Sequence, residues 1–197
     1  MIDFEKIIKK GKHIDGDVFS SLWEDLKLDE VKVRKLEFLQ TYAFMSEDNS
    51  YAKGNYKKFL KFLEKFHKNA YGGKDNLKRI HYIEYPLDHY LEMEYYTYLI
   101  NEGYGQDIRV SSDRKLFPEK VYDFLLCENG NLLIHDFSKD SWNGAWWITD
   151  KKDIKELAIW YDKLFEQSVN FKTMLLPKKE IVDGMKKLGI LDENCRI

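Results

Sequence analysis

Hydrophobic and polar positions follow two periodicities along this chain, one typical of helices and one typical of strands. Apolar residues that recur every three to four positions predict helices at 17–30, 55–68, 86–101, 153–169 and 178–187. Alternating or short apolar runs predict strands at 33–43, 77–83, 106–111, 121–127, 131–137 and 144–148. The pair Asn129-Gly130 favours a two-residue hairpin turn between two of these strands. Because helices and strands are mixed without strict alternation, we expect an α+β or α/β fold with a mixed, largely antiparallel sheet and flanking helices.

Length and composition favour one folded domain. The chain has 197 residues, of which 44% are hydrophobic and 15% aromatic, and these values exclude a disordered chain. It has three prolines and no Gly/Ser-rich tract, so we expect no linker or repeat. We therefore assign residues 1–197 to a single domain, with residues 1–16 as an N-terminal arm and residues 173–197 as a C-terminal helical extension.

Cysteine content and hydropathy are typical of a reduced, cytoplasmic protein. The two cysteines, Cys127 and Cys195, are too few for a disulfide framework and lack the spacing of a metal motif. The chain does not begin with a basic segment followed by an apolar one. No apolar stretch reaches the roughly 18 residues that a membrane span needs. We therefore expect neither secretion nor membrane spanning.

Charge is segregated along the chain, although the formal net charge is only −2. Residues 51–80 contain nine basic and two acidic residues, whereas residues 81–150 contain five basic and thirteen acidic ones. A homo-oligomer that pairs the two segments is one interpretation of this pattern. On the helix predicted at 55–68, lysines share the face opposite the apolar stripe, namely Lys57, Lys61, Lys65 and Lys68. A solvated helix face is the ordinary interpretation of these lysines, and nucleic-acid binding is the alternative.

Glu94 is the residue whose position is most informative. The helix predicted after Pro86 has an apolar stripe, and Glu94 falls inside that stripe. Burial of a carboxylate is costly unless it is paired or protonated, so the fold must supply a partner, and Arg109 on the next predicted strand is the first candidate. Two interpretations remain open. One is a structural ion pair between helix and sheet, and the other is a polar pocket of Glu94, Arg109 and Tyr90 that binds a small ligand.

Four short motifs occur in a fixed order along the chain, namely Leu36-Glu37-x-Leu39-x-x-Tyr42, Pro86-Leu87-x-x-Tyr90-x-x-x-Glu94, Gly105-x-Asp107-Ile108-Arg109 and Asp123-Phe124. In order and spacing these motifs resemble a bacterial domain family of unknown function, found mainly in actinobacterial proteins. The resemblance covers residues 17–172. It implies a small effector or sensor domain, since members are often encoded near helix-turn-helix regulators. The residues that match the family pattern form a candidate ligand pocket, namely Glu37, Tyr90, Glu94, Arg109 and Asp123.

The chain departs from the family pattern at three places. Leu125 stands where the family has a Trp, and Lys35 stands where its first strand has an Arg. Glu128-Asn129 replaces a pair of acidic residues at the hairpin turn. A site that depends on that Trp or that Arg does not carry over to this chain.

The β-α unit, the strand that ends in Ile-Arg and the hairpin also resemble the phospholipase D-like fold. That resemblance implies a catalytic His followed two positions later by a Lys. Here the nearest histidine is His135, and Phe137 stands where the Lys is required. The resemblance therefore implies a non-catalytic derivative that keeps a binding pocket. From its pattern alone, His135 is expected on the solvent face of a hairpin strand.

No recognised catalytic motif accompanies these features. There is no P-loop, no Gly-x-Ser-x-Gly and no His-Glu-x-x-His, and the five histidines are scattered, so we expect no metal and no cofactor. We predict a non-enzymatic ligand-binding or regulatory domain of a cytosolic bacterial system, with a small ligand or a protein as partner. The alternatives are an enzyme that acts on phosphodiesters or nucleotides, and a nucleic-acid-binding protein that uses the Lys-rich helix. The run from Trp142 to Trp147 is open to two interpretations, a core strand or an interaction patch.

Overall fold

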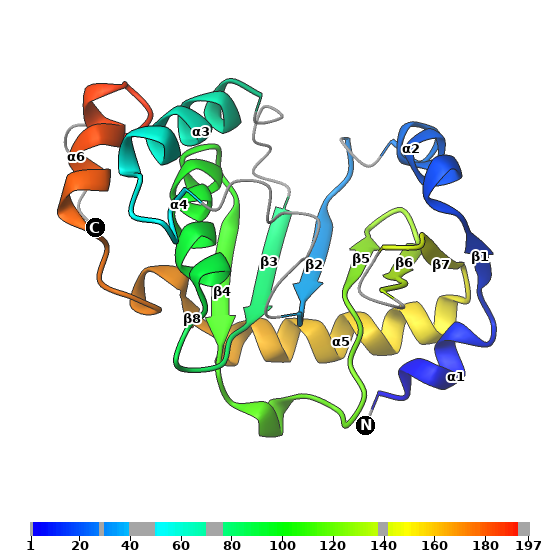
Figure 1. Ribbon diagram of the computed structural model, residues 1–197. Helices are drawn as coiled ribbons and strands as arrows, with labels where there is room; N and C mark the ends of the chain where they lie inside the picture. Colours follow the sequence, from blue (N-terminus) through cyan, green and yellow to red (C-terminus); the bar gives the residue numbers. More distant parts are fainter. Residues whose placement is uncertain (1, 28–29, 40–49, 70–76, 138–141, 193–197) are drawn as a thin grey trace.

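A single mixed sheet forms the centre of the molecule in the computed structural model, which describes residues 2–27, 30–39, 50–69, 77–137 and 142–192 (Figure 1). Its eight described strands are β1 (Lys12–Ile14), β2 (Val33–Glu37), β3 (Leu77–Tyr82), β4 (Asp107–Ser111), β5 (Phe124–Cys127), β6 (Asn131–His135), β7 (Ala145–Ile148) and β8 (Val169–Asn170). Their order in the sheet is β1-β7-β6-β5-β2-β3-β4-β8. The neighbours β2 and β3, and β3 and β4, are parallel, and the other five pairs are antiparallel.

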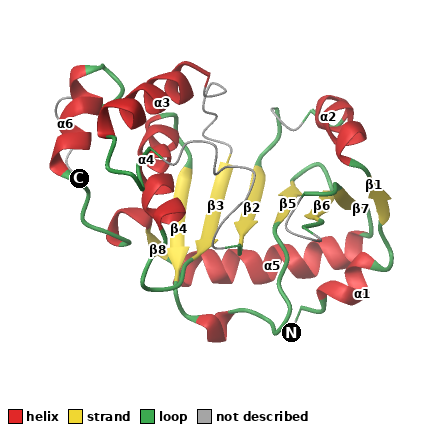
Figure 2. Cartoon of the chain, viewed as in Figure 1, coloured by secondary structure: helices red, strands yellow, loops and turns green. Residues whose placement is uncertain are grey.

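Helices cover both faces of this sheet (Figure 2). They are α1 (Phe4–Ile8), α2 (Gly16–Asp25), α3 (Tyr56–Asn69), α4 (His89–Gly103), α5 (Lys151–Gln167) and α6 (Lys179–Lys187), with short 3-10 turns at Arg114–Leu116 and Phe171–Thr173. Helix α5 packs on one face, where Leu157 and Tyr161 join the apolar core of β2, β3, β5 and β6. This arrangement confirms the expected fold class, a mixed α/β fold with a largely antiparallel sheet.

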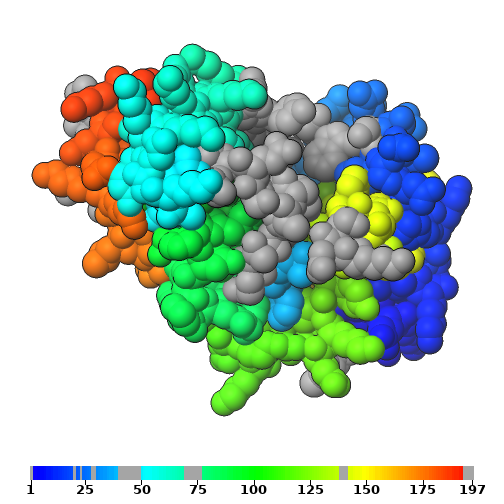
Figure 3. Space-filling model, viewed as in Figure 1, coloured from blue at the N-terminus to red at the C-terminus, as the bar shows by residue number. Residues whose placement is uncertain are grey.

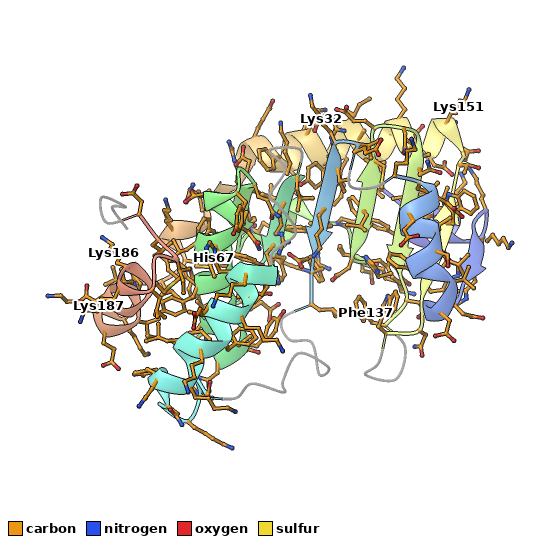
Figure 4. All side chains as sticks on the ribbon, turned by 90° about the horizontal axis from the view of Figure 1, so that it is seen from above. Lys32, His67, Phe137, Lys151, Lys186 and Lys187 are labelled. Carbon is orange, nitrogen blue, oxygen red and sulfur yellow. The ribbon has the colours of Figure 1, made fainter. Side chains whose placement is uncertain are left out.

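The opposite face of the sheet is covered at its two ends. Helix α4 packs on Ile108 and Val110 of β4, with α3 and α6 outside it. Helix α2 packs through Leu22 on the other half, where it meets Leu125 of β5 and Leu133 of β6. Strands β2 and β5 lie between these two helical groups when the molecule is seen from above (Figure 4). The apolar contacts of α4 with β4 and those of α2 with β5 and β6 therefore lie on either side of the middle of this face.

Helix α4 is buried along most of its length because it lies between the sheet and the α3–α6 pair. Its described side chains from Met93 to Asn101 are all buried, including Glu94. The helix begins at His89, later than the predicted start at Pro86, because the carboxylate of Asp88 accepts the backbone N–H of Leu91 at 2.8 Å and caps the first turn. The prediction that Glu94 is buried is confirmed.

Two parts of the chain differ from the sequence-based expectation. The first sixteen residues contribute α1 and β1 to the main fold, since Phe4 and Ile7 enter the core and β1 pairs with β7, so they are no separate arm. The strand predicted at 33–43 ends at Glu37, and residues 40–49 lie outside the described residues. In the described part of the chain, none of the helices has the length and apolar character required to cross a membrane.

Candidate functional site

Polar side chains at the ends of four neighbouring strands, β3, β2, β5 and β6, form one line. Glu37 of β2 pairs in register with His81 of β3. On the other side of β2, Leu36 pairs with Phe124 of β5, so the same register places Asp123 beside Glu37. The backbone N–H of His135, at the end of β6, donates to the carbonyl oxygen of Asp123 at 2.8 Å. We call His81, Glu37, Asp123 and His135 the polar row.

Two basic side chains lie next to this row. Lys35 and Arg79 pair in register, two residues before Glu37 and His81, so they project from the same face of the sheet. From above this face, α4 adds Glu94 and Tyr98, which contact His81. We call Lys35, Glu37, Arg79, His81, Glu94 and Tyr98 the ionic cluster.

The topology of the sheet places this site at a recognisable position. Strands β2, β3 and β4 are parallel, and the chain then leaves β4 and crosses to β5, on the other side of β2. Glu37 and His81 lie at the carboxyl ends of their strands, next to the point where the strand order reverses. In open α/β sheets, ligands bind outside the carboxyl ends of the parallel strands, which is the end where Glu37 and His81 lie.

Glu37 is the anion that holds the two basic side chains. Its Oε1 lies 2.6 Å from Lys35 Nζ and its Oε2 lies 3.2 Å from a terminal nitrogen of Arg79. Burial alone would raise the pKa of the Glu37 carboxyl, but the charges of Arg79 and Lys35 outweigh burial and hold that pKa well below its usual range. Glu37 is therefore ionised at neutral pH.

His81 carries protons on both ring nitrogens. Its Nε2 lies 2.9 Å from the carbonyl oxygen of Leu39 and must donate to it. Its Nδ1 lies 2.6 Å from the Tyr98 hydroxyl, whose single proton is donated to Glu94 Oε2, also at 2.6 Å. Tyr98 therefore accepts from Nδ1–H. This assignment agrees with the direction of the pKa of His81, which burial opposes but the carboxylates of Glu94 and Glu37 raise.

Some hydrogen-bond donors of the ionic cluster find no acceptor within the cluster. Arg79 is 9% exposed, and its Nε–H is buried without an acceptor. Lys35 contacts one carboxylate, and its side chain is 25% exposed. The carboxylate oxygens, by contrast, are engaged, since Glu37 faces Lys35 and Arg79 through separate oxygens. A buried donor without an acceptor is unfavourable, so the cluster favours an added acceptor.

His135, at the other end of the polar row, is neutral. Burial lowers the pKa of His135 to about 4, and the nearby charge of Lys35 contributes in the same direction. Trp142 Nε1–H donates to His135 Nδ1 at 3.1 Å, so the ring proton is on Nε2. In the described part of the chain, no acceptor contacts that Nε2–H. His135 thus packs against Phe19 of α2, rather than lying on the solvent face as predicted.

Aromatic rings surround His135. Its ring centroid lies 5.7 Å from that of Phe19 in α2, 5.8 Å from that of Phe137 and 6.3 Å from that of Trp142. Phe19 and Trp142 meet edge to face at 5.1 Å. All four side chains are half-buried. We call Phe19, His135, Phe137 and Trp142 the aromatic cluster.

A metal ion fits this site poorly, although Glu37, His81 and Glu94 each offer one ligand atom within 4.8 Å of the others. Glu37 is already neutralised by Lys35 and Arg79. His81 would have to lose a proton before a nitrogen could coordinate a cation. The donors that remain unused favour an anion rather than a cation.

The structure brings together four of the five pocket residues predicted from sequence. Glu37 and Asp123 are neighbours in the polar row, and burial together with the charge of Glu94, to which its hydroxyl is hydrogen-bonded, raises the pKa of Tyr90. The predicted partner of Glu94 was wrong. Arg109 projects from the opposite face of β4, where its guanidinium stacks 4.2 Å from the Phe165 ring and donates to the carbonyl oxygen of Phe165. Whether the four residues bind a ligand stays a prediction.

Sequence reasoning missed Lys35, Arg79, His81 and His135 as members of the site. The alternation of the strand at 77–82 carries a signal for two of them, since Arg79 and His81 share one face of that strand. All four lysines of α3 are exposed, and Lys68 Nζ lies 2.7 Å from Glu64 Oε1. Nucleic-acid binding by this helix stays a prediction.

Comparison with models of known families assigns the chain to one family. The model of one family, described as "Domain of unknown function (DUF6879)", matches residues 18–175. The chain belongs to the DUF6879 family. This confirms the resemblance to a family of unknown function that the ordered motifs indicated, and the matched residues of the DUF6879 domain include the whole polar row. No curated protein sequence matches the chain.

Solved structures similar to this DUF6879 domain include two proteins of low identity. NucT from Helicobacter pylori is 11% identical, with 82% of this chain and 98% of NucT covered and a TM-score of 0.44. TrmBL2, an archaeal chromatin protein whose structure shows a novel mode of DNA binding, is 12% identical, with a TM-score of 0.38. The alignment covers 82% of this chain but spans only 54% of TrmBL2. Both TM-scores lie below 0.5, so neither likeness assigns a function.

Proposed function

We propose that this domain is a non-enzymatic binding domain for a small ligand with an anionic group, and that the anion contacts the basic side chains of the ionic cluster. The observation that carries this proposal is the buried Nε–H of Arg79, which has no acceptor among the described residues, while the neighbouring carboxylate of Glu37 is engaged through both oxygens. A phosphate or carboxylate supplies several acceptor oxygens and negative charge at once.

Lys35 is the side chain through which the ligand reaches the cluster. It is a quarter exposed, whereas the side chains of Glu37 and His81 are almost fully buried. An ammonium group that is paired on one side and hydrated on the other can exchange its water for a ligand oxygen without breaking the Glu37 contact. The anion is therefore expected beside Lys35, with the buried Arg79 and His81 adding positive charge from below.

Calorimetric titration with inorganic phosphate, at constant ionic strength, tests this proposal. We expect saturable binding of one phosphate per chain, weakened at least tenfold in Lys35→Gln, since a charge-assisted hydrogen bond contributes about 1.5–3 kcal/mol. Lys78→Gln is the matched control. Lys78 belongs to the neighbouring strand but projects from the opposite face, where it lies 5.0 Å from the Phe165 ring.

Two results of the phosphate titration would contradict the proposal. If the wild-type protein shows no saturable phosphate binding, the proposal fails. It also fails if Lys35→Gln and Lys78→Gln weaken binding equally, because the effect is then one of general surface charge rather than of the polar row.

A further inference from the structure

We infer that the outer faces of α3 and α6 form a second, separate anion-binding surface, and that its partner is the phosphate backbone of double-stranded DNA. The inference goes beyond the proposed function, because it concerns another part of the molecule and a polymer rather than a small ligand. Its starting point is the charge of the two helices. Helix α3 and the segment Lys178–Lys187 contain nine lysines and three acidic residues, a net charge of +6, although the whole chain carries −2.

The lysines of α3 lie opposite its buried stripe. Phe59 and Leu63 are fully buried in the core that α4 shares. Lys57, Lys61 and Lys65 recur every four residues on the other side of the helix, where all three are exposed. Among the described residues, none of these three lysines forms an ion pair. At 1.5 Å per residue the row spans about 12 Å, the axial length of about four phosphates of one DNA strand at 3.4 Å each.

Helix α6 extends this row because it packs directly beside α3. A Cβ atom on Gly184 would lie 2.5 Å from Leu60 Cδ1, so the backbone of α6 closely approaches α3. Met185 is buried in the shared core, and Lys179 and Lys187 lie on the outer side of α6, where both are exposed. Figure 3 shows residues of α3 (cyan and teal) beside those of α6 (orange and red), and Figure 4 places Lys187 at the outer edge of the molecule. We call the following residues the basic surface: Lys57, Lys61, Lys65, Lys68, Lys179 and Lys187.

The basic surface is separate from the ionic cluster. Tyr98 of α4 contacts His81 on the sheet, whereas Tyr96 of the same helix meets Phe59 of α3 edge to face at 5.7 Å. The lysines project from the side of α3 opposite Phe59, so both helices lie between them and Lys35. Substitutions at one surface should therefore leave the other unchanged.

The chemistry of the basic surface favours duplex nucleic acid over single strands. Duplex DNA carries one negative charge per about 1.7 Å of its axis, and lysines contact its phosphates without reading the base sequence. Proteins that bind single strands stack the bases on aromatic rings. The aromatic residues of α3 are instead packed against the core, namely Tyr56, Phe59, Phe62 and Phe66.

Two other polyanions fit this surface less well than DNA. Duplex RNA is recognised in part through its 2′-hydroxyl groups, but the described face of α3 consists of lysines and Glu64, without hydroxyl or amide side chains. A membrane surface is bound through exposed apolar side chains as well as charge. Among the described residues, the large exposed apolar side chains do not belong to α3.

Fluorescence anisotropy of a labelled duplex of about 20 base pairs, titrated with the full chain, tests the inference. At about 50 mM salt we expect a dissociation constant at or below about 10⁻⁴ M, and between about 50 and 200 mM salt we expect affinity to fall about a hundredfold, as four phosphate contacts predict. The triple variant Lys57→Gln/Lys61→Gln/Lys65→Gln should weaken binding about tenfold or more and lower the slope of log affinity against log salt by about three. Each single substitution should lower that slope by about one.

The matched control removes the same charge from the other face of the sheet. Lys151→Gln/Lys152→Gln/Lys155→Gln changes three exposed lysines of α5 and should leave DNA binding within about twofold. Phosphate binding beside Lys35 should be the same in both triple variants, which also shows that both variants are folded.

Several outcomes would overturn the inference. They are an absence of duplex binding at about 50 mM salt, and an equal loss of affinity in the two triple variants. Tighter binding of single-stranded DNA, of an RNA duplex or of anionic phospholipid vesicles than of the DNA duplex would also overturn it. Duplex binding without phosphate binding would contradict only the proposed function, and phosphate binding without duplex binding would contradict only this inference.

Discussion

The two ends of the polar row contain the same type of residue in opposite charge states. His81 and His135 project from the same face of the sheet, yet the pKa of His81 is raised and the pKa of His135 is lowered to about 4. Burial disfavours the charged form of both rings. The difference is in their neighbours, because the carboxylates of Glu94 and Glu37 outweigh burial at His81, whereas at His135 the charges of Lys35 and Glu37 act in opposite directions and burial lowers the pKa. The neighbours, rather than burial, decide which end of the row is ionic.

The His81 end and the His135 end of the polar row therefore have different structural roles. At the His81 end, charges are paired with one another and hold α4 to β2 and β3. At the His135 end, a neutral ring accepts a hydrogen bond from Trp142 and lies among aromatic side chains. Substitutions should therefore destabilise the fold most at the ionic end, beside which the anion is proposed to bind, and least at the aromatic end.

The largest effect is expected from Glu37→Gln. It removes the anion that both Lys35 and Arg79 face, and an uncompensated buried charge costs about 3–5 kcal/mol. Urea denaturation should show this loss in the free energy of unfolding. Glu166→Gln, on the exposed side of α5, should stay within about 0.5 kcal/mol of the wild type. A loss below about 1 kcal/mol for Glu37→Gln would show that the ionic cluster does not hold the fold.

A double-mutant cycle between His81 and Glu94 is expected to give the next largest effect. The two side chains are linked directly and through Tyr98, so a coupling energy of about 0.5–3 kcal/mol is expected. The matched cycle pairs Glu94 with Arg109, which lies on the opposite face of the sheet. That cycle should give additive changes within about 0.5 kcal/mol. The reverse ranking of the two cycles would restore Arg109 as the partner of Glu94.

The two histidines predict a stability maximum near pH 6.5. Above that pH the folded state keeps the proton of His81 longer than the unfolded state does, so stability falls as pH rises through the raised pKa. Between pH 6.5 and about 4, His135 is protonated in the unfolded state but stays neutral in the folded state, so stability falls as pH drops. Below about pH 4.5, the lowered pKa values of Glu37 and Glu94 add to this acid loss.

Urea midpoints measured from pH 4 to pH 9 check this profile. His81→Gln should flatten the alkaline side, and His135→Gln should flatten the region between pH 6.5 and 4.5. A profile whose alkaline side is unchanged in His81→Gln would show that His81 is neutral in the folded protein.

The smallest effect on stability is expected from Trp142→Phe. The change keeps an aromatic ring but removes the hydrogen bond to His135 Nδ1, which is worth about 1 kcal/mol. The His135 ring is then no longer held in one tautomer, and ring nitrogen NMR shifts should report a mixture of the two neutral forms. An unchanged His135 spectrum in this variant would mean that Trp142 does not set the tautomer.

The pattern of the sequence predicted the long elements but not the short ones. Five helices and six strands lie where periodicity placed them, because each contains enough residues to show its period. The three-residue β1 and the two-residue β8 are too short for any alternation. The register between β2 and β3, which brings Lys35 beside Arg79, depends on distant parts of the chain and has no local signal.

The candidate site was partly predictable for the same reason. The apolar stripe of α4 predicted that Glu94 is buried, but it did not identify His81 as the partner. The error over Arg109 was avoidable, because its neighbours Ile108 and Val110 are apolar and face α4, so Arg109 must project to the other face. The charge states of His81 and His135 follow from contacts between strands and helix that only the folded structure shows.

The most direct test of the central claim is NMR of the protein labelled with nitrogen-15 in its histidines, titrated with inorganic phosphate at pH 7. We predict that His81 is doubly protonated and His135 is a neutral Nε2–H tautomer before phosphate is added. We also predict that the His135 signal shifts saturably as phosphate binds. Phosphate binding that moves neither histidine, or a neutral His81 in the free protein, would contradict this account.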